Sequence, residues 1–344
     1  MTNVSTKADP RQLEWAVKGP VVRLRVKGAE TAFKVPSHAI VIGTGTDCDF
    51  QLHDPEGLAS RRHARVEVRD GACVITDLGS TNGTKVDGRS QGSAELAPGD
   101  TIQLGGCSLI AESAQSIELH ELLRRFMGWS KARLPEVDQA LQIVRDVAHL
   151  RAALILRGQG GLVGIARRLH DLLLGHERPF VVHESGESGV AAQDRAIDGT
   201  LVLNGEKLPR DIQPVLVSLR LPNIRVRLVI VANTAEAAAE VATMIRVVAR
   251  IAIPTLRERV DELDRLAVSY AHGGARALGA ASPALGPHDL VWVRADDIQT
   301  HEELEKLMLR IVAVRNWGVT EASGRLSMSH GALSRYLRRH GIAT

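Results

Sequence analysis

The fold of the first third of the chain is decided by IVIGTGTDCDFQLHDPEGLASRRHARVEV (residues 40–68) and by VITDLGSTNGTKVDG (residues 74–88). Both stretches alternate apolar or β-branched residues with polar ones, and turn residues separate the alternating runs. The same pattern continues outward to residue 21 on one side and to residue 113 on the other. We therefore predict an all-β domain over residues 21–113, preceded by a leader over residues 1–20.

Three elements occur together inside this domain: SRRHA at residues 60–64, DLGSTNGT at residues 77–84, and Gly-Asp at residues 99–100 before a final strand. Each element alone would be an ordinary polar loop or turn, because Asn-Gly between strands favours a turn with positive φ. Together the three elements resemble a forkhead-associated (FHA) domain. The resemblance implies a β-sandwich that holds a phosphothreonine peptide on the loops at one end.

The side-chain chemistry of these elements suits a phosphate. Ser60 can donate a hydroxyl hydrogen bond to a phosphate oxygen, and Arg61 or Arg62 can add a charge-assisted hydrogen bond. By the resemblance, Asn82 would hold the peptide backbone, with Thr81 beside it. These five residues are the predicted phosphopeptide site.

Two positions qualify this prediction. We expect His63 to order the loop that presents Ser60 rather than to act as a ligand or a base. FHA domains usually carry an arginine where this chain has Thr44, and its loss removes a charged hydrogen bond of about 2 to 3 kcal/mol. The alternative is a sandwich that uses the same loops for an unphosphorylated partner.

Residues 135–285 alternate apolar helical stretches with short strands, a pattern typical of a parallel α/β sheet. We expect residues 114–134 to form a mixed helical connector, and the Gly- and Ala-rich residues 271–287 to form a linker. The glycine-rich turn at residues 158–164 suggests a phosphate-binding loop. However, it lacks the lysine that reaches phosphates and the hydroxyl that holds magnesium.

Parts of this region resemble the AAA+ domain of the sigma-54 enhancer-binding activators. The segments that carry the resemblance are residues 166–170, 199–213 and 253–263. The expected remnants of a nucleotide site are Gly158, Gly161 and Asn204, where Asn204 and Gly205 replace carboxylates that would bind magnesium and activate water. We predict a degenerate, non-hydrolysing scaffold with no catalytic residue, metal or cofactor; the alternative is an ATP-dependent sigma-54 activator with an atypical nucleotide site.

Residues 290–344 have the pattern of helices only, and the acidic residues end before residue 325. The stretch WGVTEASGRLSMSHGALSRYLRRHGI (residues 317–342) contains a capping residue, a turn and an amphipathic second helix. It resembles the Fis-type helix-turn-helix that ends the same activator family. The resemblance implies a DNA-binding surface made of Thr320, Ser329, His330, Ser334, Arg335, Arg338 and Arg339. His330, Ser334 and Arg335 would approach base edges, and Thr320, Arg338 and Arg339 the phosphates.

Composition excludes some classes of protein. Of the 344 residues, 44% are hydrophobic and 24% are charged, and the chain has no long apolar run that could span a bilayer. The first residues lack the apolar core of a secretory signal, so we expect a cytoplasmic protein without a membrane partner. The net charge of +3 is too small to indicate nucleic-acid binding by itself. The clustering of positive charge at one end therefore carries that argument.

The sequence as a whole predicts a multidomain protein: an FHA sandwich, a degenerate AAA+-like α/β domain and an all-α helix-turn-helix domain. We expect a transcriptional regulator rather than an enzyme, whose partners are DNA and a Ser/Thr-phosphorylated protein. A homodimer is the usual form of Fis-type readers. The remaining alternative is an FHA phosphopeptide adaptor that does not bind DNA.

Overall fold

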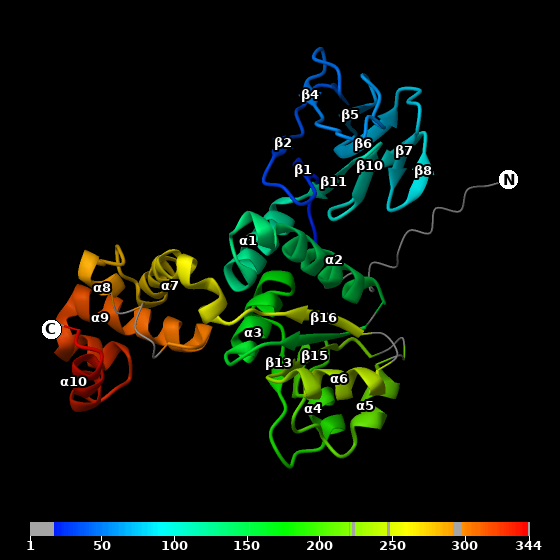
Figure 1. The fold of residues 1–344 in the computed structure, drawn as a ribbon. Coiled ribbons are helices and arrows are strands. Elements are labelled where there is room, and N and C mark those ends of the chain that lie inside the picture. Colours follow the sequence, from blue (N-terminus) through cyan, green and yellow to red (C-terminus); the bar gives the residue numbers. More distant parts are fainter. Residues whose placement is uncertain are drawn as a thin grey trace.

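The computed structural model describes residues 17–150, 152–219, 221, 224–245, 248–291, 293 and 298–342. Figure 1 shows three units, which we call the sandwich unit (residues 21–112), the α/β unit (residues 114–252) and the C-terminal helical unit (residues 256–342). Most of the predicted leader, residues 1–16, lies outside the described residues. Within the described part of the chain, no helix is both long and apolar enough to cross a membrane.

The sandwich unit confirms the predicted all-β domain. Its first sheet has the order β2 (Ala32–Lys34), β1 (Arg23–Val26), β11 (Cys107–Glu112), β10 (Thr101–Leu104), β7 (Thr84–Val86), β8 (Arg89–Gln91). Its second sheet has the order β4 (Phe50–Gln51), β3 (Ile40–Gly43), β5 (Ala64–Arg69), β6 (Ala72–Asp77), β9 (Ser93–Glu95). Alternate residues of the two sheets form one buried core, which includes Ile102 and Leu109 of the first sheet and Ile42 and Val66 of the second.

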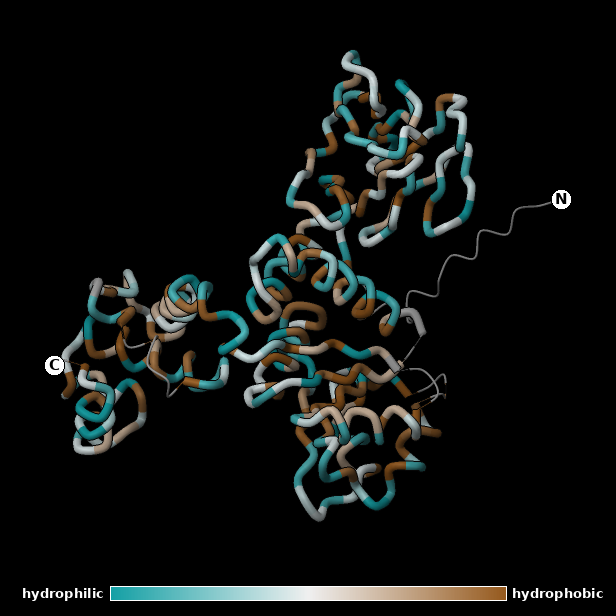
Figure 2. Tube along the Cα trace, viewed as in Figure 1, coloured by the Kyte–Doolittle hydropathy of each residue, from teal (hydrophilic) through white to brown (hydrophobic). Residues whose placement is uncertain are grey.

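The α/β unit contains a parallel sheet, as the sequence pattern predicts. Its strand order is β13 (Phe180–Val182), β14 (Thr200–Asn204), β15 (Arg227–Ala232), β12 (Ala153–Arg157), β16 (Val248–Ala252). Leu154 and Leu156 share one core with helices α1 (Ala114–Met127), α2 (Leu134–Leu150) and α3 (Leu162–Leu173). Ile155 shares another core with helices α4 (Gly189–Arg195), α5 (Ile212–Ser218) and α6 (Ala235–Met244). Hydrophobic residues accordingly gather along the strands between these two helical layers (Figure 2).

The segment expected to be a connector, residues 114–134, is largely part of this packing. It forms α1 and the short helix η2 (Lys131–Arg133), and α1 lies against both α2 and α3. Leu119, Leu123 and Phe126 of α1 are buried in the same core as the sheet. The sequence pattern is helical, but it does not say which surface would cover the apolar face of the helix.

The C-terminal helical unit consists of η3 (Leu256–Glu262), α7 (Leu263–Leu278), α8 (Pro287–Val291), α9 (His301–Arg325) and α10 (His330–Arg339). Residues of η3, α7, α9 and α10 share one buried core. The prediction of a linker at residues 271–287 is wrong for its first half, because α7 continues through these residues to Leu278. Gly274 has a packing role there: a Cβ at this position would lie 3.3 Å from Leu309 of α9. The predicted domain boundary at residues 285–290 falls inside this unit.

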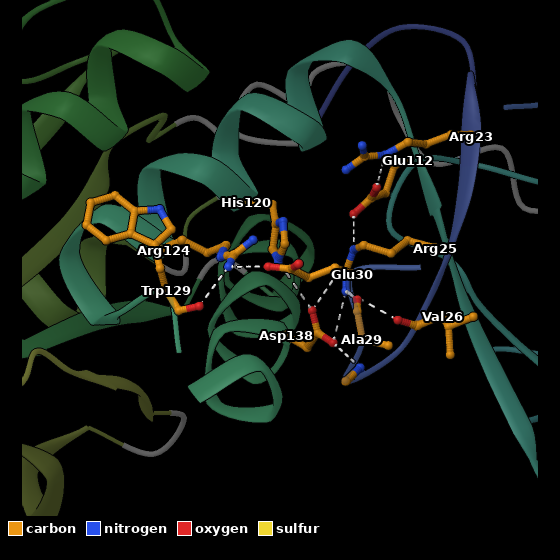
Figure 3. A network of polar contacts seen from close by, with 11 residues as sticks. Arg23, Arg25, Val26, Ala29, Glu30, Glu112, His120, Arg124, Trp129 and Asp138 are labelled. Atoms are coloured by element: carbon orange, nitrogen blue, oxygen red, sulfur yellow. Dashed lines mark hydrogen bonds and ion pairs between the residues drawn. The ribbon is translucent and has the colours of Figure 1, made fainter. Parts of the chain in front are cut away.

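A buried ionic network joins the sandwich unit to α1 and α2 (Figure 3). Arg25 of β1 is 1% exposed, and its guanidinium donates to the Asp138 carboxylate at 2.5 and 3.3 Å and to Glu112 at 2.8 Å. Asp138 also accepts a hydrogen bond of 2.6 Å from the Gly28 amide. Burial opposes the charge, but Asp138 and Glu112 raise the pKa of Arg25 above its usual value. The network therefore keeps its ions paired away from water.

Replacing Arg25 by Met should leave the Glu112 and Asp138 carboxylates buried without their shared cation. We expect Arg25→Met to lower the free energy of unfolding by about 3 to 5 kcal/mol, measured by urea denaturation of the full chain followed by circular dichroism. The matched control is Arg133→Met, because Arg133 pairs only with the two exposed carboxylates of Glu136 and Glu258 among the described residues, and its loss should cost at most about 1 kcal/mol. Equal losses in the two variants would contradict the account.

Candidate functional site

Two loops of the sandwich unit meet around Ser60. The Ser60 hydroxyl accepts a hydrogen bond of 3.0 Å from the Thr81 amide and lies 3.4 Å from the Thr81 hydroxyl. One residue further on, the Asn82 side-chain amide donates to the Leu58 carbonyl at 2.7 Å. The structure thus brings Ser60, Thr81 and Asn82 together from the loop before β5 and the loop before β7.

His63 links the two loops through hydrogen bonds to both. It is fully buried, its Nδ1 accepts from the Ser60 amide at 3.1 Å, and its Nε2 lies 3.2 Å from the Gly83 carbonyl. One tautomer, with the proton on Nε2, satisfies both hydrogen bonds. The geometry matches the ordering role that the sequence analysis expects for His63.

Asp77 is a second organiser of the site, and the sequence analysis does not single it out. Its carboxylate accepts from the Gly79 and Ser80 amides at 3.0 Å each, from the Ser80 hydroxyl at 2.6 Å and from the Thr84 hydroxyl at 2.8 Å. Desolvation acts to raise the pKa of Asp77, but these hydrogen bonds outweigh it and lower that pKa. The available signal was an Asp two residues before a Gly, which is typical of an Asx turn.

The two arginines that follow Ser60 have different surroundings. Arg62 pairs with Asp47 at 3.2 Å, and both side chains are exposed. Arg61 is also exposed, and its guanidinium has no ion pair among the described residues. The hydroxyl of Thr44, at the position of the missing arginine, is directed to the Ala59 carbonyl at 3.4 Å. Arg61 is therefore the cation beside Ser60 that is free to meet an anion.

The path of the backbone also matters here. A Cβ on Gly43 would lie 2.0 Å from the Arg61 carbonyl oxygen, so this position requires glycine. The close approach lets the Gly45 amide and the Cys48 thiol donate to the same Arg61 carbonyl, both at 2.9 Å. The loop that carries Ser60 and Arg61 is thereby fixed on both sides.

A cavity of about 220 Å³ lies beside Asn82. It is lined by Leu58, Asn82, Gly83, Lys85, Gln103 and Gly105. Leu58 and Lys85 give it one apolar and one cationic wall. A peptide held at Asn82 could place one side chain in this cavity.

The glycine loop after β12 has a different environment from that of a ligand site. Gly158, Gly161 and Asn204 all lie at the carboxyl edge of the parallel sheet, where open α/β sheets bind ligands. A Cβ on Gly160 would lie 2.4 Å from the Thr300 side chain, and a Cβ on Gly161 would lie 3.1 Å from that of Glu302. The first turn of α9 therefore rests on the loop. Asn204 uses its side-chain oxygen locally, accepting from the Glu206 amide at 2.8 Å.

The third set of predicted residues lies on α10, at its N-cap and in the last two turns of α9. Ser329 caps α10 by accepting from the Ala332 amide at 3.2 Å, while Leu333 and Leu337 are fully buried. Gly318 breaks the helical path inside α9, and Ser327 forms the turn into α10 with a φ of 52°. The exposed predicted residues are Thr320, Ser329, His330, Arg335, Arg338 and Arg339, and Ser334 is half-buried.

This surface is cationic and firmly attached. Arg335, Arg338 and Arg339 have no acidic partner within the described ranges of the chain. The Arg310 guanidinium of α9 lies 3.9 Å from the centre of the Tyr336 ring, which fixes α10 against α9. Thr320 lies on the preceding helix rather than on α10. The remaining predicted residues lie along α10, all of them exposed except the half-buried Ser334.

Comparison with known proteins identifies the sandwich unit. Residues 40–105 match the family model of the FHA domain. The FHA domain-containing protein FhaA of Mycobacterium tuberculosis is 34% identical over 83 residues, which are 24% of this chain and 15% of FhaA. The oxoglutarate dehydrogenase inhibitor of Corynebacterium jeikeium is 30% identical over 105 residues, which are 30% of this chain and 72% of that protein.

A solved structure described as an analysis of phosphothreonine-dependent FHA domain interactions is 32% identical, with a TM-score of 0.25. The match covers 26% of this chain and 94% of the solved one. This chain thus aligns with most of some relatives and with a small part of FhaA. The family model and the curated relatives place the Ser60, Thr81 and Asn82 loops in a known family, and the chain belongs to the FHA domain-containing proteins.

Proposed function

We propose that this protein is a cytoplasmic, DNA-binding transcriptional regulator whose FHA domain recognises a phosphothreonine-bearing partner. Its C-terminal helices would bind DNA as a Fis-type helix-turn-helix, and its α/β unit would act as a non-hydrolysing, AAA+-like scaffold. The observation that carries the proposal is the fixed Ser60–Thr81 pair with Arg61 beside it, which forms no ion pair with any carboxylate that the structure describes. That arrangement presents hydroxyl donors and a cation to a phosphate group, on loops that need no rearrangement.

The phosphopeptide proposal follows from what each group can donate. Ser60 and Thr81 each carry a hydroxyl proton that can turn toward a phosphate oxygen, while their backbone contacts keep them in place. Arg61 supplies the charge that the residue at position 44 does not supply. Because Arg61 is exposed, the phosphate would remain partly hydrated, and we expect modest affinity.

The scaffold proposal rests on the residues that pack against the glycine loop. A phosphate there would need free backbone amides and a cation. The loop instead packs against the Thr300 side chain and against the backbone and Cβ of Glu302, which take up the space beside Gly160 and Gly161. This favours a protein without ATPase activity over the alternative of an ATP-dependent activator, and it calls for no metal or cofactor.

The DNA proposal rests on agreement between packing and charge. The buried leucines of α10 face the core, while its arginines are exposed and no described carboxylate pairs with them, as a helix for the major groove requires. A homodimer would present two such helices to two half-sites. An adaptor that binds only phosphoprotein remains the competing function, and DNA binding decides between them.

The two arginines after Ser60 should differ in their effect on peptide binding. Because Arg62 is already paired with Asp47, Arg61→Ala should weaken capture of a phosphothreonine peptide by roughly 10- to 100-fold, and Arg62→Ala by much less. Ser60→Ala and Asn82→Ala should each weaken it as well. Fluorescence anisotropy with labelled phosphothreonine peptides measures these changes. Equal binding of the unphosphorylated peptides, with no effect of Ser60→Ala or Asn82→Ala, would refute phosphate recognition.

The α/β unit should not bind Mg-ATP tightly, because the glycine loop lacks a lysine and is covered by α9. Calorimetric titration of the full chain should give no saturable binding at micromolar nucleotide, and phosphate release should stay at background. Micromolar affinity, or phosphate release that is abolished by substituting Gly158 and Gly161, would overturn the scaffold proposal.

The arginines of α10 should separate specific from general DNA binding. Arg339→Ala removes a cation near the end of the helix and should weaken all DNA sequences about equally, lowering the salt slope by roughly one unit. Arg335→Ala should cost roughly 1 to 3 kcal/mol on the specific site and relax discrimination at one base pair. Gel shifts over a salt series measure both effects. If neither variant changes binding or its salt dependence, the adaptor function is the better one.

A further inference from the structure

Helix α1 contacts all three units of the chain. It follows directly after β11, and its Gln115 side chain donates to the Leu172 carbonyl of α3 at 2.8 Å. Leu119, Leu123 and Phe126 bury its apolar face in the core of the α/β unit. Its last turn faces two other partners, the β1–β2 turn of the FHA domain and the start of the C-terminal helical unit.

The contact with the FHA domain is made by Arg124. Its guanidinium, on a residue that is 6% exposed, donates to the Glu30 carboxylate of the β1–β2 turn at 2.6 Å and to the Trp129 carbonyl at 2.9 Å (Figure 3). One side chain of α1 thus holds the FHA turn and the segment after the helix at the same time.

The segment after α1 is held from the other side by η3. The Glu262 carboxylate accepts from the Trp129 and Ser130 amides, each at 2.7 Å. Arg259 donates to Glu262 at 2.9 Å and to the last carbonyls of α1, those of Arg125 at 2.8 Å and Phe126 at 2.9 Å. Arg259 is 4% exposed, so water cannot readily replace these bonds.

The same end of α1 reaches the first turn of α9. The Phe126 ring meets the His301 ring edge to face, with centres 5.5 Å apart. His301 is buried, and its Nδ1 lies 2.9 Å from the Tyr270 hydroxyl of α7. The start of α9 also packs on the glycine loop. The start of α9 therefore contacts both α1 and this loop, so the position of α1 affects how the helical unit packs against the α/β unit.

We propose that residues 124–130 of α1 and the segment after it, together with Glu262 and Arg259, form a relay that mechanically couples the FHA domain to the C-terminal helical unit. Each link is a direct hydrogen bond: Glu30 to Arg124, Arg124 to Trp129, Trp129 to Glu262, and Glu262 to Arg259. Loosening the relay at its FHA end loosens η3 and the start of α9. The relay requires neither phosphothreonine nor DNA, so it stands or falls apart from the proposed function.

Hydrogen–deuterium exchange of the full chain without ligands tests the relay. Arg124→Met removes both of its contacts and should speed exchange about tenfold in residues 129–130, 259–263 and 301–306. Glu30→Gln, at a half-exposed side chain, should speed exchange in the same segments by a smaller factor. Strands β3 and β10 should keep their protection in both variants.

The matched control is Glu67→Gln, which removes one carboxylate from the same domain. Glu67 pairs with Arg65 and Arg69 within its own sheet, so this variant should leave residues 259–263 and 301–306 unchanged. The relay is wrong if Arg124→Met speeds exchange only in residues 129–130, or if Glu67→Gln has the same distant effect. If Arg124→Met also speeds exchange in β3 and β10, the milder variant Glu30→Gln is used in its place. The relay is then wrong if Glu30→Gln speeds exchange only in residues 129–130.

Discussion

The burial of Arg25 constrains the rest of the structure. A guanidinium that is 1% exposed must be paired, and its two carboxylates come from different units: Glu112 from the last strand of the sandwich and Asp138 from α2. The FHA domain is therefore docked through the end where its chain leaves for α1. In Figure 1, strand β4 lies at the opposite end of the domain, remote from α1. The loop that carries Ser60 follows β4 in the chain and lies against Gly43, which pairs with β4, so a partner can bind there without displacing the dock.

A second constraint operates at the sheet edge. The carboxyl end of β12 is the place where an α/β fold offers a glycine loop to an anion, yet here the loop supports Thr300 and Glu302. Glycines have no side chain, so a glycine loop that lets its backbone approach a phosphate also lets a helix pack closely against it. Arg168 of α3 adds an ion pair with Glu305, one turn further along α9. This edge thereby serves attachment of the helical unit.

Local sequence motifs predict much of the fold, whereas the contacts between residues far apart in the chain could not be predicted. The loops around Ser60 and Asn82 carry their own turn chemistry, so the sandwich and the closeness of Ser60, Thr81 and Asn82 could be predicted together. The dock could not, because Arg25 and Asp138 lie 113 residues apart and nothing near either residue in the chain names its partner. The linker predicted over residues 271–287 fails in its first half for a related reason: glycine is typical of linkers by composition, but here Gly274 lets α7 and α9 pack closely. The cover on the glycine loop likewise comes from residues about 140 positions away.

We propose, as the central claim, that one chain carries both a phosphothreonine reader and a DNA reader. The most direct measurement is a bridging assay, in which beads bearing a phosphothreonine peptide are mixed with the full chain and a pool of labelled genomic DNA fragments. The account predicts that DNA is retained with the chain, is lost when the peptide is dephosphorylated, and is reduced with Arg335→Ala. Retention of the chain on the peptide with no DNA above that variant's background would contradict it.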